Sequence, residues 1–223
     1  MNIGMWLSGF FFLFIIITNF ASNYFGYKTF GDVDSNAQLQ EINNDPTRFK
    51  ISVGLILIEH LGIISLAVTL FLALSTYNMI LGIVWCTSRI VEALIQIYDK
   101  KNYWGLLNIA RKYSDISGAE KNVLIDLGRN ILKRKESIFV IAQLFFSIGT
   151  ISYSILFVTY AYEVVPVFIG WFGIIASIIY GLGNGIFIIK PNFKVMWSLG
   201  GLLILLFEIL LGGWLLIYSF IIL

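Results

Sequence analysis

Residues 51–98 read ISVGLILIEHLGIISLAVTLFLALSTYNMILGIVWCTSRIVEALIQIY. Two apolar runs, 51–74 and 77–98, are separated by a short polar turn. Each is long enough to cross about 30 Å of hydrocarbon as a helix. A backbone in lipid must satisfy its own hydrogen bonds, so both runs are predicted to be transmembrane helices. The same stretch carries four acidic or basic side chains inside these runs, namely Glu59, His60, Arg89 and Glu92.

Four further apolar runs have the same length and composition, at about 5–25, 138–161, 165–189 and 195–221. Hydrophobic residues make up 58% of the 223 positions and charged residues only 13%, which leaves too few charges for a soluble surface. The first run has no basic residues before it, so we interpret it as a retained span and not as a cleaved signal. The sequence predicts one all-α domain over 1–223, a bundle of six transmembrane helices.

The basic residues are distributed unevenly between the connections. Fourteen of the fifteen Lys and Arg lie in loops one, three and five, and Arg89 alone lies inside a span. Cytoplasmic loops collect basic residues. The pattern therefore predicts a multi-pass protein of the cell membrane, with loops one, three and five in the cytoplasm and both termini outside.

The third loop, 99–137, is too long for a simple connection. Apolar residues recur in it at helical spacing with basic residues around them, at Val123, Leu124, Leu127, Ile131 and Leu132. This pattern favours an amphipathic helix at about 117–135, lying in the headgroup plane. Such a helix either rests on anionic lipid or serves as a lid or a docking site for a protein partner.

Polar side chains inside the spans form the candidate binding site for a ligand or a proton: Glu59, His60, Arg89, Glu92, Gln143, Asn184 and Glu208. Most lie within about 15 Å of the side with the basic loops, and Glu208 lies deeper. An ion at a helix centre costs about 2.5 to 3.5 kcal/mol, so these groups must be paired, protonated or hydrated. Two interpretations remain open. One is a polar cavity that binds or moves a small solute, lipid or proton, and the other is a structural charge cluster in a non-catalytic membrane subunit or scaffold.

Several chemistries do not fit the residues in the spans. No span contains Lys, which excludes a retinal Schiff base, and no span contains Asp, which excludes an aspartyl protease. The single His does not suffice for a zinc hydrolase. We therefore expect no metal and no cofactor, and an intramembrane enzyme is the third hypothesis. The net charge of +2 does not suggest nucleic acid. The expected partners are membrane lipids, a small solute or amphiphile, and a protein at 99–137.

Five short motifs resemble an uncharacterised family of prokaryotic multi-pass membrane proteins, domain of unknown function 4386. They are PTRFK at 46–50, RIVEA at 89–93, FFSIG at 145–149, PVFIG at 166–170 and FEILLG at 207–212. The resemblance covers nearly the whole chain and implies that Arg89, Glu92 and Glu208 are family-like positions, without implying an activity. Family members often carry basic residues at the N-terminus and in loops two and four, and that pattern implies the opposite orientation.

Overall fold

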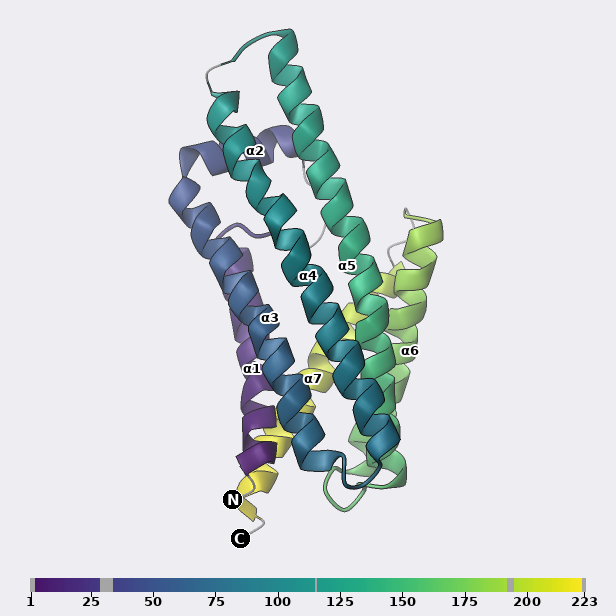
Figure 1. Cartoon of the computed structure of the whole chain (residues 1–223). Helices are drawn as coiled ribbons and strands as arrows, with labels where there is room; N and C mark the ends of the chain where they lie inside the picture. The colour runs from purple at the N-terminus through teal and green to yellow at the C-terminus, as the bar shows by residue number, and fades with distance from the viewer. Residues whose placement is uncertain (1–2, 29–33, 115, 192–194, 222–223) are drawn as a thin grey trace.

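The computed structural model describes residues 3–28, 34–114, 116–191 and 195–221, and the chain is helical throughout these ranges apart from its connections. Figure 1 shows the helices in order along the chain: α1 (Ile3–Tyr24), α2 (Ser35–Asn44), α3 (Pro46–Leu74), α4 (Met79–Tyr113), α5 (Ala119–Thr159), α6 (Val167–Ile189) and α7 (Val195–Ile221). All of them except the short α2 are long and apolar enough to cross a membrane. The expected all-α fold with six membrane-spanning helices is therefore confirmed.

Local signals at the helix starts explain where the spans begin. Asp45 precedes α3, and its carboxylate accepts a hydrogen bond from the backbone N–H of Arg48 at 2.9 Å, with Pro46 in the first turn. Asn78 caps α4 in the same way through the N–H of Leu81 at 3.1 Å. Side-chain oxygens at these positions satisfy backbone donors that the helix itself leaves open.

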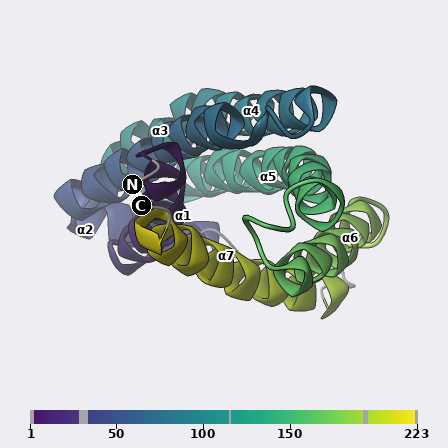
Figure 2. The ribbon, with the colours of Figure 1, turned by 90° about the horizontal axis from the view of Figure 1, so that it is seen from below.

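The six spanning helices form a closed ring in the order of the sequence. Each packs against the next one along the chain, and α7 returns to α1. Across the described residues, no spanning helix packs against one on the far side of the ring. Figure 2 views this arrangement along the bundle. The interior of the ring is therefore filled by side chains from all six helices and not by a central helix.

The half of the ring interior near the two termini is an apolar core, which we call the apolar plug. Its largest side chains come from five of the six helices: Phe12, Leu66, Leu70, Trp85, Tyr153, Phe157, Phe207 and Leu211. Tyr153 lies centrally, with its ring 4.2 Å from that of Trp85 and 6.0 Å from that of Phe207 between centroids. Aromatic and aliphatic packing fills this half of the ring, and hydrogen bonds from Ser8 to Thr69 and from Ser152 to the carbonyl oxygen of Leu81 also join its helices.

Glycines set the tilt of α7 across the ring. Near the termini, a Cβ added to Gly9 of α1 would lie 2.7 Å from the carbonyl oxygen of Gly212, so the two backbones touch there. At the other end of α7, a Cβ on Gly200 would lie 2.6 Å from the Cα of Tyr180 in α6. Helix α7 therefore contacts α1 at one end and α6 at the other, and Figure 1 shows α1 and α7 diverging away from the termini.

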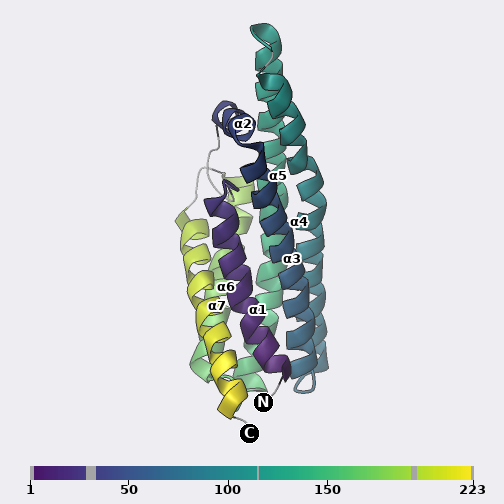
Figure 3. The same cartoon turned by 90° about the vertical axis from the view of Figure 1, so that its left-hand side faces the viewer.

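The segment 117–135 differs from the separate helix in the headgroup plane that the sequence suggests. It is helical from Ala119, but it is the first part of the continuous helix α5. With the last part of α4 it forms a hairpin that extends beyond the rest of the bundle, and α2 lies across the base of that hairpin (Figure 3). Leu39 and Ile42 of α2 are buried there together with Leu106 and Tyr113, and the apolar residues of the hairpin that pack against this cluster include Leu124, Ile131 and Leu132.

Candidate functional site

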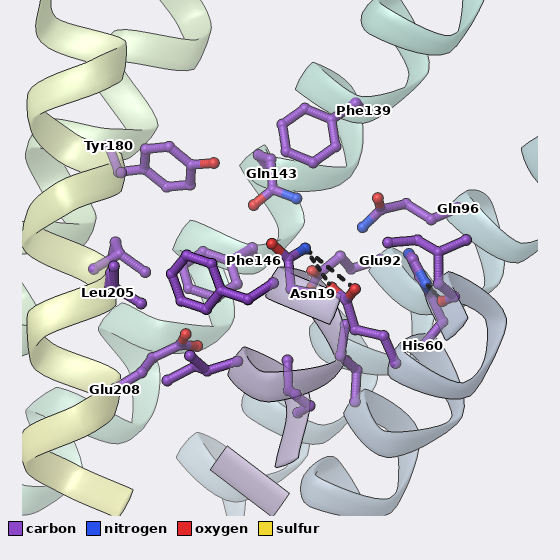
Figure 4. A pocket seen from close by; sticks show the side chains of 18 of the residues that line it. Asn19, His60, Glu92, Gln96, Phe139, Gln143, Phe146, Tyr180, Leu205 and Glu208 are labelled. Carbon is purple, nitrogen blue, oxygen red and sulfur yellow. Dashed lines mark hydrogen bonds between the residues drawn. The ribbon is translucent and has the colours of Figure 1, made fainter. Parts of the chain in front are cut away.

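The half of the ring interior away from the termini contains a cavity of about 480 Å³, which we call the polar cavity. All six spanning helices contribute to its walls. Its polar lining consists of Asn19, Tyr27, Glu59, His60, Arg89, Glu92, Gln96, Gln143, Tyr180, Ser198 and Glu208. Figure 4 shows Tyr180 and Glu208 on one side of the space and His60, Glu92 and Gln96 on the other. Six of the seven side chains expected from the sequence line this one space.

Arg89 and Glu92 form a buried ion pair on successive turns of α4. The Nη1 of Arg89 lies 2.6 Å from the Oε2 of Glu92, and the two residues are only 1% and 2% exposed. The guanidinium carbon also lies 4.4 Å from the ring centroid of Phe146 and 5.4 Å from that of Trp85, which is cation–π geometry. The intramembrane cation is thus held by one acid and two aromatic rings of the protein.

Glu59 has a polar partner that the sequence alone did not reveal. The side-chain amide of Asn19 donates to both carboxylate oxygens of Glu59, each at 3.1 Å, and so links α1 to α3. Asn19 is an amide side chain within the first span, at a depth similar to that of Glu59, and this was the signal that could have identified it. His60 is turned onto its own helix, where Nδ1 contacts the carbonyl oxygen of Ile56.

Glu208 stands apart from the other two glutamates of the cavity. Among the described residues its carboxyl group has no hydrogen bond and no ion pair, although it comes from the middle of α7 and points into the polar cavity (Figure 4). The cavity thus contains three carboxyl groups and one guanidinium group, and that guanidinium is already paired with Glu92. The arrangement leaves Glu208 as an acceptor without a donor.

Asn184 is the one expected site residue that does not line the cavity. It is fully buried, and its amide donates to the carbonyl oxygen of Tyr180 at 2.8 Å. Its side-chain oxygen accepts a hydrogen bond from the indole N–H of Trp197 at 3.1 Å. Because Tyr180 and Trp197 both line the cavity, Asn184 positions part of the wall from behind.

The roof of the cavity, on the side away from the plug, is formed by Tyr27 in the connection after α1. The ammonium groups of Lys135 and Lys100 lie 4.4 Å and 5.2 Å from its ring centroid, and Lys135 also donates to the carbonyl oxygen of Lys28. Burial raises the pKa of the Tyr27 phenol well above its ordinary value, and nearby Tyr103 adds to this effect, so Tyr27 stays neutral. The roof lysines form no ion pair with a cavity acid in the described part of the chain.

Across the described residues, no three His, Cys, Asp or Glu side chains come close enough together to hold a metal ion. The arrangement can accept hydrogen bonds and balance positive charge through its carboxyl groups.

Comparison with known proteins places the chain in a family. Residues 7–218 match the family described as "Domain of unknown function (DUF4386)". No curated protein and no solved structure matches the chain. The match covers nearly the whole chain and agrees with the motifs at 46–50, 89–93, 145–149, 166–170 and 207–212. This multi-pass chain with its buried charges therefore belongs to the DUF4386 family.

Proposed function

We propose that this membrane protein binds a small solute or the polar group of an amphiphile in the polar cavity. The observation that carries this proposal is the carboxyl group of Glu208, which has no partner among the described residues and faces a space of about 480 Å³ lined by six helices. Glu208 is half-buried and faces this space, so its carboxyl oxygens can accept a hydrogen bond from a molecule inside it. A ligand that supplies a donor would therefore gain a hydrogen bond there without breaking one within the protein.

The charge balance favours a ligand that donates hydrogen bonds or carries positive charge. The only guanidinium in the cavity is paired with Glu92 and covered by Phe146, so it is poorly placed to receive an anion. Glu59 accepts only from Asn19, and Glu208 accepts from nothing among the described residues. An ammonium or guanidinium group on the ligand would satisfy the acid that lacks a donor.

Translocation through the ring would require more than the cavity itself. The apolar plug fills the interior between the polar cavity and the termini. A solute in the cavity therefore has no path to that side unless Phe12, Tyr153 and Phe207 repack. Binding is the simpler function for this arrangement, and transport would add a conformational change to it.

The second candidate function is a membrane subunit that binds a protein partner through the α4–α5 hairpin. Val123 and Leu127 are 59% and 47% exposed on this hairpin, in a segment that also carries many basic residues. In this case the charges in the cavity only hold the bundle together. An intramembrane enzyme remains the third and weakest hypothesis.

Thermal unfolding of the purified full chain tests the proposal. A panel of small amines, amino acids, amphiphiles and inorganic ions is added across pH, and we expect at least one amine-bearing compound to raise the melting temperature. Glu208→Gln should abolish that increase, whereas Glu163→Gln, at an exposed site between α5 and α6, should leave it unchanged. If no compound shifts the wild-type protein, the binding proposal is overturned and the subunit alternative leads. Capture of partners with and without residues 117–135 would then test that alternative.

We also infer an orientation in the membrane from the distribution of basic residues. Loops one, three and five should be cytoplasmic, with both termini outside, because fourteen Lys and Arg lie on one side. Reporter fusions at the C-terminus and in the turn near Gly118 measure this directly. A cytoplasmic C-terminus would reverse the orientation and leave the ring and its cavity unaffected.

A further inference from the structure

The polar cavity lies beside the part of the bundle where α1 and α7 diverge. Both helices touch near the termini, at Gly9 and Gly212, and then diverge. On the diverging part, the same residues that line the cavity are also exposed on the outer surface: Phe20 of α1 is 60% exposed and Leu202 of α7 is 54% exposed. Their exposure indicates that the cavity opens between these two helices.

The surroundings of this opening are hydrocarbon and not water. Both helices are apolar spans, and the rim of the opening consists of Ile16, Phe20, Leu202 and Leu205. We call the space between the diverging parts of α1 and α7 the wedge. Glu208 lies one turn before Gly212 on α7, so its carboxyl group lies near the narrow end of the wedge, where the two helices meet. A molecule that fits this shape has an apolar chain at the rim and a polar head at the vertex.

We propose that the wedge between α1 and α7 admits a cationic amphiphile sideways from the membrane, with its amine head at Glu208 and its alkyl chain between Phe20 and Leu202. This inference rests on the proposed function and specifies its ligand class and route of entry. Charge complementarity argues for an amine, because Glu208 is the acid without a donor. The apolar rim argues for an alkyl chain, since a freely soluble amine gains nothing from contact with Phe20 and Leu202.

The first experiment compares four probes on the full chain in a non-ionic maltoside detergent. Dodecylamine carries both features, propylamine has only the head group, and dodecanoate and dodecanol have the chain with an anionic or neutral head. We expect dodecylamine alone to raise the melting temperature. Glu208→Gln should weaken its binding about tenfold or more, because the ammonium then loses its charged partner.

The second experiment blocks the opening with a matched pair of glycine substitutions on α7. Gly201 lines the cavity, and a Cβ there would meet only the ring edge of Tyr180 at 3.7 Å, so Gly201→Phe should fold and fill the wedge. Gly213 has no atom within 4 Å of an added Cβ, so Gly213→Phe is the control. Dodecylamine should fail to stabilise the Gly201 variant and should stabilise the Gly213 variant as it does the wild type.

A labelling measurement keeps the test decisive if Gly201→Phe does not fold. Cys86 is the only cysteine, so Cys86→Ser provides a background for single cysteines. In that background, dodecylamine should slow the alkylation of Leu202→Cys at the opening. It should not slow that of Leu210→Cys, which is 46% exposed on α7 but does not line the cavity.

The outcomes separate this inference from the proposed function. If propylamine stabilises the wild type as well as dodecylamine does, through Glu208, the cavity binds its ligand from water and the lateral route is wrong. Equal stabilisation by dodecanoate would overturn the cationic head group. Equal effects of dodecylamine on the two glycine variants or on the two cysteines would overturn the entry between α1 and α7. Only the absence of any response in the wider panel would overturn the proposed function as well.

Discussion

The two halves of the ring interior are built from the same six helices, yet one is packed solid and the other is hollow. In the apolar plug, Gly9 and Gly212 let the α1 and α7 backbones touch, and aromatic rings fill the remaining space. Beside the polar cavity, α7 contacts α6 at Gly200 and is separated from α1. The difference shows that the hollow does not come from a lack of apolar residues. It comes from the tilt of one helix, which small residues at its two ends determine.

The largest effect should come from removing Arg89, the cation that lines the polar cavity in the described part of the chain. Arg89→Ala leaves Glu92 buried without a counter-charge, which costs about 3 to 5 kcal/mol in comparable buried pairs. The double variant Arg89→Leu with Glu92→Leu should recover most of that loss, because no charge then remains unpaired. The free energy of unfolding in mixed micelles is measured for the wild type, for Arg89→Ala and for the double variant. An Arg89→Ala protein as stable as the wild type would show that the pair contributes nothing to the fold.

The next largest effect should come from the contact that closes the apolar plug. In Gly9→Leu, the added side chain meets backbone atoms of Gly212 and Leu216 at 2.7 and 2.8 Å, so α1 and α7 must separate. Overpacking of this kind costs about 2 to 3 kcal/mol. The control is Gly213→Leu, which lies beside Gly212 on α7, since an added Cβ at Gly213 meets nothing within 4 Å. Equal melting temperatures for these two variants would contradict the idea that close backbone contact closes the plug.

A smaller effect is expected at the hydrogen bond between α1 and α3. Asn19→Ala removes both hydrogen bonds to Glu59, and because each hydrogen bond contributes about 0.5 to 1.5 kcal/mol, a loss of about 1.5 kcal/mol is expected. Asn108→Ala, the same substitution at an exposed position of α4, should change stability by less than about 0.5 kcal/mol. The same unfolding assay compares them. Equal losses at both positions would show that Asn19 does not act through Glu59.

The smallest effect should be at Glu208. Because this carboxyl group has no partner among the described residues, Glu208→Gln removes no interaction, and the unliganded variant should lie within about 1 kcal/mol of the wild type. The same exchange at Glu92 breaks an ion pair and should be clearly destabilising. A large loss at Glu208 would mean that this acid is a structural member of the bundle, and the contrast between its site and the Arg89–Glu92 pair would disappear.

Much of the fold could be predicted from the sequence, since the spans and their capping residues follow from local composition. The pairing of helices could not. In a membrane, an apolar side chain suits both a lipid-facing surface and a packed core, so the pattern in α1 or α7 does not say which face meets its neighbour. The sequence did not predict the α4–α5 hairpin. The charges after Tyr98 indicate where a span leaves the hydrocarbon, but charged residues do not end a helix. Helix α4 therefore continues to Tyr113.

The same limit applies to the candidate site. Arg89 and Glu92 were recognisable together because they lie three residues apart on one helix. Asn19 and Glu59 come from different helices, and their hydrogen bonds depend on how α1 and α3 pack. Asn184 looked like a site residue because it is polar within a span, but its two hydrogen bonds are made behind the wall. Sequence spacing identifies neighbours within a helix and leaves contacts between helices open.

The ring in sequence order has a consequence for how the chain assembles during synthesis. Each helix from α3 to α7 packs on the one before it, so every new span finds its partner already in the membrane. The contact between α1 and α7 is the exception, because it joins elements nearly the whole chain apart. Until α7 inserts, Glu59, Arg89 and Glu92 face an open side of the bundle. We therefore expect ring closure to be the late step of biogenesis, and an intermediate without α7 to be the species that membrane quality control recognises.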